Sequence, residues 1–142
     1  MITVGRALEV ADDACEKVGF NPRALPLSLQ VVNLIGDLDF EMNQGGVYGW
    51  LVNSTGEYGP DTVKALETVG AHQCAAIVRE MLAFFPEGTP ASDCRERVQQ
   101  MEDIGEVGER RWDELRDRLL AWPDDIYALL EKFIAEHEAD FS

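Results

Sequence analysis

The sequence predicts an all-α fold: a single compact bundle of about seven or eight helices, in one acidic domain covering residues 1–142. Apolar residues recur at helical spacing through most of the chain, and the alternation typical of a strand is never sustained. Proline and glycine separate the periodic stretches at short intervals. A chain of 142 residues, 46% of them hydrophobic, is long enough to bury the core of one domain.

The first part of the chain predicts two helices and a sharp corner. Residues 4–18 form an amphipathic helix closed by Gly19, and a second helix begins near Leu27 and runs to Met42. The Asn-Gln-Gly-Gly run at 43–46 stops this helix, because glycine allows backbone angles that are closed to other residues. An apolar segment then follows, from which three side chains are expected to enter the core: Tyr48, Trp50 and Leu51.

The middle of the chain predicts a pair of helices. Gly59-Pro60-Asp61 begins the first of them, since proline is accepted in the first turn, and Gly70 caps its end. The second helix covers residues 71–85. Together with the corner, these helices form the core motif of residues 41–86, and a surface loop follows at 86–90.

The last part of the chain predicts three helices. Ser92 caps a helix that runs to about Ile104, and the two glycines at 105 and 108 mark a break. Apolar residues at 112, 115, 119 and 122 define a long helix. Pro123 restarts the chain for the closing helix, whose apolar positions lie within 126–134.

The charge balance excludes several classes of function. Twenty-seven acidic against twelve basic residues give a net charge of −15, which repels nucleic acid and anionic membranes and attracts basic partners. The acids are spread along the chain. Three cysteines, at 15, 74 and 94, fit a reducing compartment, and no leader or membrane span is evident, so we expect a cytoplasmic protein.

A search for chemical sites gives none that the residue pattern supports. Asp37, Asp39 and Glu41 lack the glycine of a calcium loop, and His72 with Cys74 supplies too few ligands for zinc. The glycines at 45 and 46 have no lysine and serine after them, as a phosphate loop requires. We therefore predict no catalytic residue, no metal site, no cofactor and no enzymatic activity.

One ordered block carries a family resemblance. It reads Glu41-x-Asn43-x-Gly45-Gly46-x-x-x-Trp50-Leu51-x-Asn53-Ser54-x-Gly56, followed by Ala65-Leu66-x-x-x-Gly70-Ala71 and Phe85-Pro86. This pattern resembles the DNA mimic protein 19 family of small bacterial helical proteins. The tail, from Leu115 to Leu119 and from Ile126 to Phe141, is similar to that family as well. Two positions depart from the family pattern, Val47 where an aromatic is common and Gly49 where a glutamine is common.

The resemblance implies an all-α, dimeric, non-enzymatic protein whose acidic surface occupies the DNA-binding face of a transcription regulator. The motif consists of glycines, asparagines and an aromatic residue, which are the types that a tight helix corner needs. We therefore expect a structural role for Asn43, Gly45, Gly46, Trp50, Asn53 and Gly70. Charge permits the mimicry, since −15 matches the charge of about 25 Å of duplex.

Two acidic surfaces are candidates for binding such a partner. The first lies along the late helices: Glu102, Asp103, Glu106, Glu109, Asp113, Glu114, Asp117, Asp124 and Asp125. The second combines the first helix with its neighbour: Glu9, Asp12, Asp13, Glu16, Asp37 and Glu41. Interleaved arginines at 110, 111, 116 and 118 could neutralise the first surface through pairs within the helix, and a solvated charged face is the competing interpretation of each acid.

Two other functions remain open from the sequence. An immunity or antitoxin-like inhibitor that covers a basic nuclease needs the same acidic surface. A small metal-dependent hydrolase needs a pocket in which several acids or His72 converge.

Overall fold

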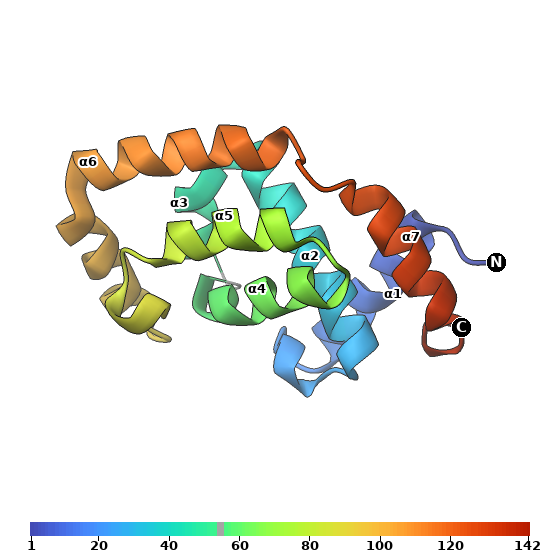
Figure 1. Ribbon diagram of the computed structural model, residues 1–142. Helices are drawn as coiled ribbons and strands as arrows, with labels where there is room; N and C mark the ends of the chain where they lie inside the picture. Colours follow the sequence, from blue (N-terminus) through green and yellow to red (C-terminus); the bar gives the residue numbers. More distant parts are fainter. Residues whose placement is uncertain (54–55) are drawn as a thin grey trace.

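The all-α fold is confirmed by the computed structural model, which describes residues 1–53 and 56–142 (Figure 1). Within these ranges the chain forms seven α-helices and four short 3₁₀ helices, and no strand. The α-helices are α1 (Val4–Lys17), α2 (Leu27–Gln44), α3 (Gly46–Val52), α4 (Gly59–Thr68), α5 (His72–Leu82), α6 (Cys94–Leu120) and α7 (Ile126–Glu136). The 3₁₀ helices are Pro22–Ala24, Gly56–Tyr58, Pro86–Gly88 and Glu138–Phe141. Ser54, a residue of the sequence motif, lies outside the described residues.

Helix α2 lies at the centre of the bundle and packs against α1, α3 and α4. Its residues 31–35 are all buried, as are Leu38 and Met42, so this helix is enclosed over most of its circumference. Helices α4 and α5 pack together as a hairpin, α6 lies across α3 and α5, and α7 contacts α1 (Figure 1). In the described part of the chain, none of the helices combines the length and the apolar character that a membrane span requires.

The corner between α2 and α3 is held by contacts from both sides. Gly46 begins α3 with φ +68°, a left-handed conformation that favours glycine. The Asn53 side chain donates a hydrogen bond to Glu41 Oε2 at 2.6 Å, which joins the end of α3 to the last turns of α2. Arg116 from α6 donates to the Met42 carbonyl oxygen at 2.8 Å, satisfying an acceptor at the end of α2. The motif thus builds the corner through polar contacts as well as through glycine.

Tyr48 was expected to enter the core, and this prediction is wrong. Val47, Trp50 and Leu51 are buried on one face of α3, as positions i, i+3 and i+4 of a helix should be. Tyr48 is 47% exposed, because it lies about 100° around the helix from Val47. Phe40, in the last turns of α2, is likewise exposed, at 60%.

Several helix ends also differ from the prediction. Asp93, not Ser92, caps α6, since its carboxylate accepts a hydrogen bond from the backbone N–H of Glu96. Helix α5 ends at Leu82, three residues before Phe85, so that Phe85 is buried from the connection. The predicted cap at Gly70 is confirmed by its φ of +90° after the end of α4.

Helix α6 turns sharply near its first third (Figure 1). Gly105 has φ 72° and ψ −170°, a conformation outside the helical region, and the helix continues on the other side of it. Gly108 does not break the helix and is buried within it. The break predicted at Gly105 is therefore confirmed, since two helical segments meet at this residue within α6, whereas the predicted part of Gly108 in the break is wrong.

Candidate partner-binding surfaces

The helical geometry of α6 determines on which side of the helix each carboxylate lies. At about 100° per residue, the buried residues of the second segment define one face: Gly108, Trp112, Leu115 and Leu119. Four exposed acids, at i, i+3, i+7 and i+11, follow one line on the side of the helix turned away from that face: Glu106, Glu109, Asp113 and Asp117. We call these four residues the α6 acid stripe. Glu102 and Asp103 are exposed as well, on the turn that precedes the kink.

The arginines of α6 make their contacts away from the stripe. Arg111 binds Glu80 of α5 at 2.7 Å and Glu114 at 2.9 Å, and Arg118 lies 3.7 Å from the same Glu80. Arg116 is directed at the Met42 carbonyl. Of the acids predicted on α6, only Glu114 takes part in an ion pair among the described residues. Arg110 is exposed beside the stripe, and Arg116 lines a hollow together with Glu109 and Asp113, so these two arginines remain close to its acids.

A shallow hollow adjoins the stripe on the side of α3. Glu109, Asp113 and Arg116 line it from α6, and Gly46 and Tyr48 line it from α3. The exposed Tyr48 ring therefore stands beside two acids of the stripe. An aromatic ring with a phenol group next to carboxylates suits contact with a protein surface, where tyrosine supplies both apolar area and a hydrogen bond.

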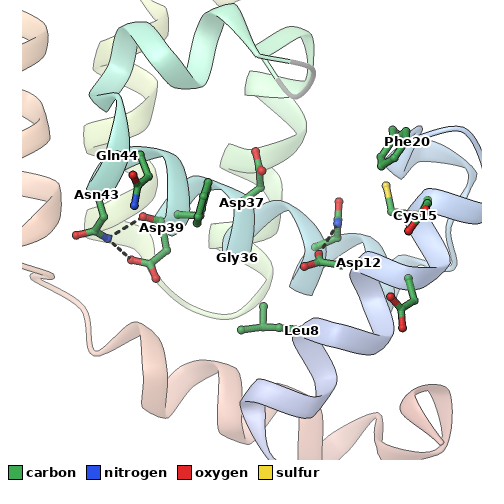
Figure 2. Close-up of a pocket in the computed structure, with 13 residues that line it drawn as sticks. Leu8, Asp12, Cys15, Phe20, Gly36, Asp37, Asp39, Asn43 and Gln44 are labelled. Atoms are coloured by element: carbon green, nitrogen blue, oxygen red, sulfur yellow. Dashed lines mark hydrogen bonds between the residues drawn. The ribbon is translucent and has the colours of Figure 1, made fainter.

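The second surface is a groove of about 780 Å³ between α1 and α2 (Figure 2). Leu8 of α1 lies over Gly36 of α2, where a Cβ atom would stand 2.5 Å from Leu8 Cδ2, so this glycine allows the close approach of the two helices. Exposed aromatic rings line the groove at Phe20 and Phe40. Its acids are Asp12, Asp13, Glu16, Asp37 and Asp39. We call this feature the α1–α2 groove.

Partial burial and neighbouring negative charges raise the pKa of two groups in the groove, Asp12 and Cys15. Burial of its carboxylate raises the pKa of Asp12, although the residue as a whole stays exposed. The hydrogen bond from Asn33 acts in the opposite direction, and the charges of Asp37 and Asp13 raise the pKa further. Burial also raises the pKa of the Cys15 thiol, with smaller contributions from Asp12 and Asp37. The groove is therefore a region of negative potential.

Three predicted partner-binding acids have structural contacts instead. Glu41 is only 8% exposed and accepts the hydrogen bond from Asn53, so burial removes it from the acidic surface. Asp124 accepts hydrogen bonds from the backbone N–H of Cys74 at 2.8 Å and from Gln73 Nε2 at 3.2 Å, which caps α5 from a distant segment. Asp125 caps α7 through the backbone N–H of Ala128. Glu9 is exposed and pairs with Arg6 at 3.0 Å.

The cap lowers the pKa of Asp124. Partial burial acts to raise it, but the hydrogen bonds from Cys74 and Gln73 together outweigh that effect. Burial raises the pKa of the Cys74 thiol to about 11, so this cysteine is neutral at physiological pH. Cys94 is exposed, and all three thiols are free.

The structure adds residues that the sequence search did not select. Asn33, Asp39, Phe20 and Phe40 all line the α1–α2 groove. Phe40 carried no signal of exposure, because it fits the apolar spacing of its helix and yet is 60% exposed. Asn33 carried none, since only packing shows that it is buried. Among the described residues, no group of three or more histidine, cysteine, aspartate or glutamate side chains could hold a metal ion.

These features define an acidic, all-helical domain that presents carboxylates on its surface. The family model described as DMP19-like protein matches residues 23–137, most of the chain, and the chain belongs to this family. The match includes the whole core motif of residues 41–86 and confirms the resemblance drawn from it. No curated protein and no solved structure matches the chain.

Proposed function

We propose that this chain is a non-enzymatic bacterial protein that binds a basic, DNA-binding transcription regulator, with the α6 acid stripe in the place of a DNA strand. Membership of the DMP19-like family is consistent with a DNA-mimic role. The observation that carries the proposal is the separation of charge on α6. Its acids remain exposed on one line, while Arg111 and Arg118 are directed to Glu80 and Arg116 to a backbone carbonyl.

The spacing of the stripe supports one strand of DNA rather than a whole duplex as the object of mimicry. From Glu106 to Asp117 the helix rises roughly 16 Å, over which one DNA strand carries about five phosphates. Four carboxylates stand on this length of α6. A duplex carries twice the charge of one strand, so the stripe alone is too sparse to replace both strands.

A basic partner gains from this arrangement because the carboxylates are already held in line. A helix fixes their backbone positions, so ordering them costs little entropy when the partner binds. The contact is electrostatic and exposed to solvent, and its affinity should therefore fall steeply with salt. A regulator that is bound in this way cannot hold DNA on the same face.

Neutralising the stripe tests the proposal. A triple variant, Glu109→Gln, Asp113→Asn and Asp117→Asn, should lose a basic partner that the wild-type protein retains from native lysate. The matched control neutralises three exposed acids elsewhere, Glu87→Gln, Glu131→Gln and Glu136→Gln, and should retain the partner. Equal loss of the partner by both variants would show that binding depends on net charge, and full retention by the stripe variant would show that the stripe is not the binding surface.

The activity of the retained partner distinguishes the regulator from the alternative, an immunity or antitoxin-like inhibitor. Both partners are basic and both bind the stripe, so the same variants apply. A sequence-specific DNA-binding protein supports the first function. A nuclease that loses its cleavage activity in the complex supports the second.

We also infer a cytoplasmic homodimer, an expectation that comes from the family and from the three free cysteines. Sedimentation equilibrium of the purified chain measures its mass directly. A mass of twice 15.8 kDa over a wide concentration range supports the dimer, and a mass of 15.8 kDa contradicts it.

A further inference from the structure

The α1–α2 groove is lined by acidic and apolar side chains together. Leu8 and Gly36 lie where α1 and α2 approach each other, and acids from both helices line the groove (Figure 2). None of its thirteen lining residues is basic. Within the described part of the chain, no ion pair involves Asp12, Asp13, Glu16 or Asp39. No basic side chain of the described residues therefore neutralises these four acids through an ion pair.

A buried amide provides an independent observation. Asn33 is 7% exposed, and its Nδ2 atom donates to Asp12 Oδ1 at 3.0 Å across the space between α2 and α1. The oxygen of the same planar amide, Oδ1, is buried and has no hydrogen-bond partner. Asn33 is one of the residues that line the groove, so this unpaired acceptor belongs to the groove wall, on the same amide that binds Asp12. Buried acceptors without a partner are rare, and a donor that entered here would satisfy it.

Aromatic rings complete the lining. Phe20 and Phe40 are each 60% exposed and line the groove together with the apolar Leu8. Phe20 also has φ 61°, which is uncommon for a residue other than glycine. Aromatic faces attract cations and apolar side chains, so the lining suits a ligand that carries both.

We infer that the α1–α2 groove binds an arginine side chain of a protein partner, presented on a short segment whose neighbouring apolar residues pack against Leu8, Phe20 and Phe40. A guanidinium group offers five N–H donors in one plane. These donors can serve the Asp12 carboxylate, the Asn33 amide oxygen after a small side-chain movement, and a second acid of the rim.

Arginine fits this site better than lysine. Its guanidinium is less strongly hydrated than an ammonium group, stacks on aromatic rings and binds carboxylates through two hydrogen bonds at once. The ammonium of lysine is a compact, strongly hydrated charge and would lose more of its hydration in a partly apolar groove. The site therefore discriminates between two residues of equal charge.

A second copy of this chain is a poorer occupant. The net charge is −15, so a second copy would bring mainly acidic side chains to this acidic groove, and the homodimer inferred above is expected to form through another surface. Of the described residues, no group of acids and histidines is arranged to hold a metal ion, which argues against a divalent cation as the occupant. A basic segment supplies the missing charge and the apolar contact together.

The groove is a separate site from the α6 acid stripe, although the two surfaces come together along the chain. Gln44 lines the groove at the end of α2, and Gly45 lines the hollow beside Glu109 and Asp113. A partner on the stripe could therefore extend an arginine-bearing segment into the groove. The inference does not rest on the proposed function, since it follows from the groove alone.

Titration calorimetry with synthetic peptides tests the inference. The probe is a short, end-blocked peptide with one arginine between leucines at helical spacing, and its partner peptide carries citrulline, which has the same shape without the charge. The arginine peptide should bind one site, and the citrulline peptide should bind at least ten-fold more weakly. A lysine peptide should bind at least three-fold more weakly than the arginine peptide.

Protein variants place the binding site. Asp12→Asn should weaken the arginine peptide at least five-fold, while the amide oxygen introduced by this substitution can still accept the hydrogen bond from Asn33. Asp113→Asn on the α6 acid stripe removes the same charge and should change the affinity less than two-fold. Amide chemical shifts of residues in α1 and α2 should move on titration. Equal binding of arginine and citrulline peptides, equal loss in both variants, or self-association that the peptide reverses would each overturn the inference.

Discussion

Arg97 is 3% exposed, and its four hydrogen bonds all go to backbone carbonyls. Leu51 and Asn53 lie at the end of α3, and Ala91 and Ser92 lie in the loop before α6. Helix ends leave carbonyl groups without partners, and the guanidinium supplies donors to several of them at once. The same reasoning applies to Arg116 at the end of α2, so two arginines of α6 fix the corner of the core motif.

Arg97→Met should lower the free energy of unfolding by about 2–4 kcal/mol, because buried carbonyls lose charge-assisted hydrogen bonds. Urea denaturation followed by circular dichroism measures the change. The control is Arg95→Met, two residues away on the exposed side of the same helix, which should change stability by less than about 0.5 kcal/mol. Similar losses in both variants would contradict the capping role of Arg97.

Asp124 gives stability a dependence on pH. Its pKa is lower in the folded protein than in the unfolded chain, so its stabilisation is present above the ordinary pKa of 3.8 and is lost as the pH falls through the folded-state value. Asp124→Ala should therefore cost about 1 kcal/mol at pH 7, and the difference from wild type should shrink toward pH 3. Urea denaturation at a series of pH values measures this. A difference that stays constant across this pH range would contradict the cap.

Asp12 in the α1–α2 groove acts on stability with the opposite sign. The pKa of Asp12 is raised in the folded protein, so its ionised form destabilises the fold as the pH rises through that value. Acids that lie together in a groove although they destabilise the fold are typical of binding sites. Such sites keep groups that lower stability because these groups contact a ligand. Asp12 and Asp124 are therefore the same residue type with opposite effects on stability.

At the scale of the elements, the kink of α6 positions both its caps and its acids. The segment before Gly105 carries Arg97 to the end of α3, and the segment after it carries the acid stripe beside α3 and the two arginines beside α5. A straight helix could not satisfy both sets of contacts. The conformation of Gly105, with φ 72° and ψ −170°, is closed to residues that carry a Cβ atom.

Gly105→Ala should therefore destabilise the protein by about 1–3 kcal/mol, even though a Cβ atom there meets no other group within 4 Å. Gly5→Ala is the matched control, because Gly5 lies in α1 with ordinary helical geometry and equally open surroundings. It should stabilise the protein by about 0.5–1 kcal/mol. Thermal denaturation separates the two. A neutral Gly105→Ala variant would show that the kink does not require glycine.

Local signals in the sequence predicted most of the architecture. Proline and glycine placed the starts of α2 and α4 and the ends of α1 and α4, and helical spacing identified α7 and the second segment of α6. These features depend on neighbours in the chain. Tyr48 was placed wrongly because the direction of a short helix relative to the core depends on the helices that cover it.

The candidate sites depended more on contacts between distant residues. Sequence reasoning listed the acids of both surfaces but could not separate exposed ones from those with structural partners, such as Glu41 and Asp124. It also left open whether the arginines of α6 neutralise the stripe. For Arg111, Arg116 and Arg118 the contacts are made with Glu80 and the Met42 carbonyl, which lie far from α6 in the chain.

At the scale of the whole molecule, the acids behind the net charge of −15 have different structural roles. Several acids cap helices or form ion pairs, whereas those of the α6 acid stripe, with Asp13 and Glu16 of the α1–α2 groove, are exposed and form no ion pair with another described residue. Self-repulsion between such acids lowers stability, so a cation-bearing partner gains both contact and relief of repulsion. The fold thus presents two negative surfaces on a rigid helical scaffold.

Competition between this protein and duplex DNA for the captured basic partner tests the central claim most directly. Fluorescence anisotropy of a labelled duplex reports how much partner remains on DNA as the protein is added. Strand mimicry predicts full displacement of the duplex and no ternary complex. It also predicts that salt weakens both complexes, and that the stripe variant displaces DNA at least ten-fold less effectively than its charge-matched control. A stable ternary complex of partner, DNA and protein would contradict the account.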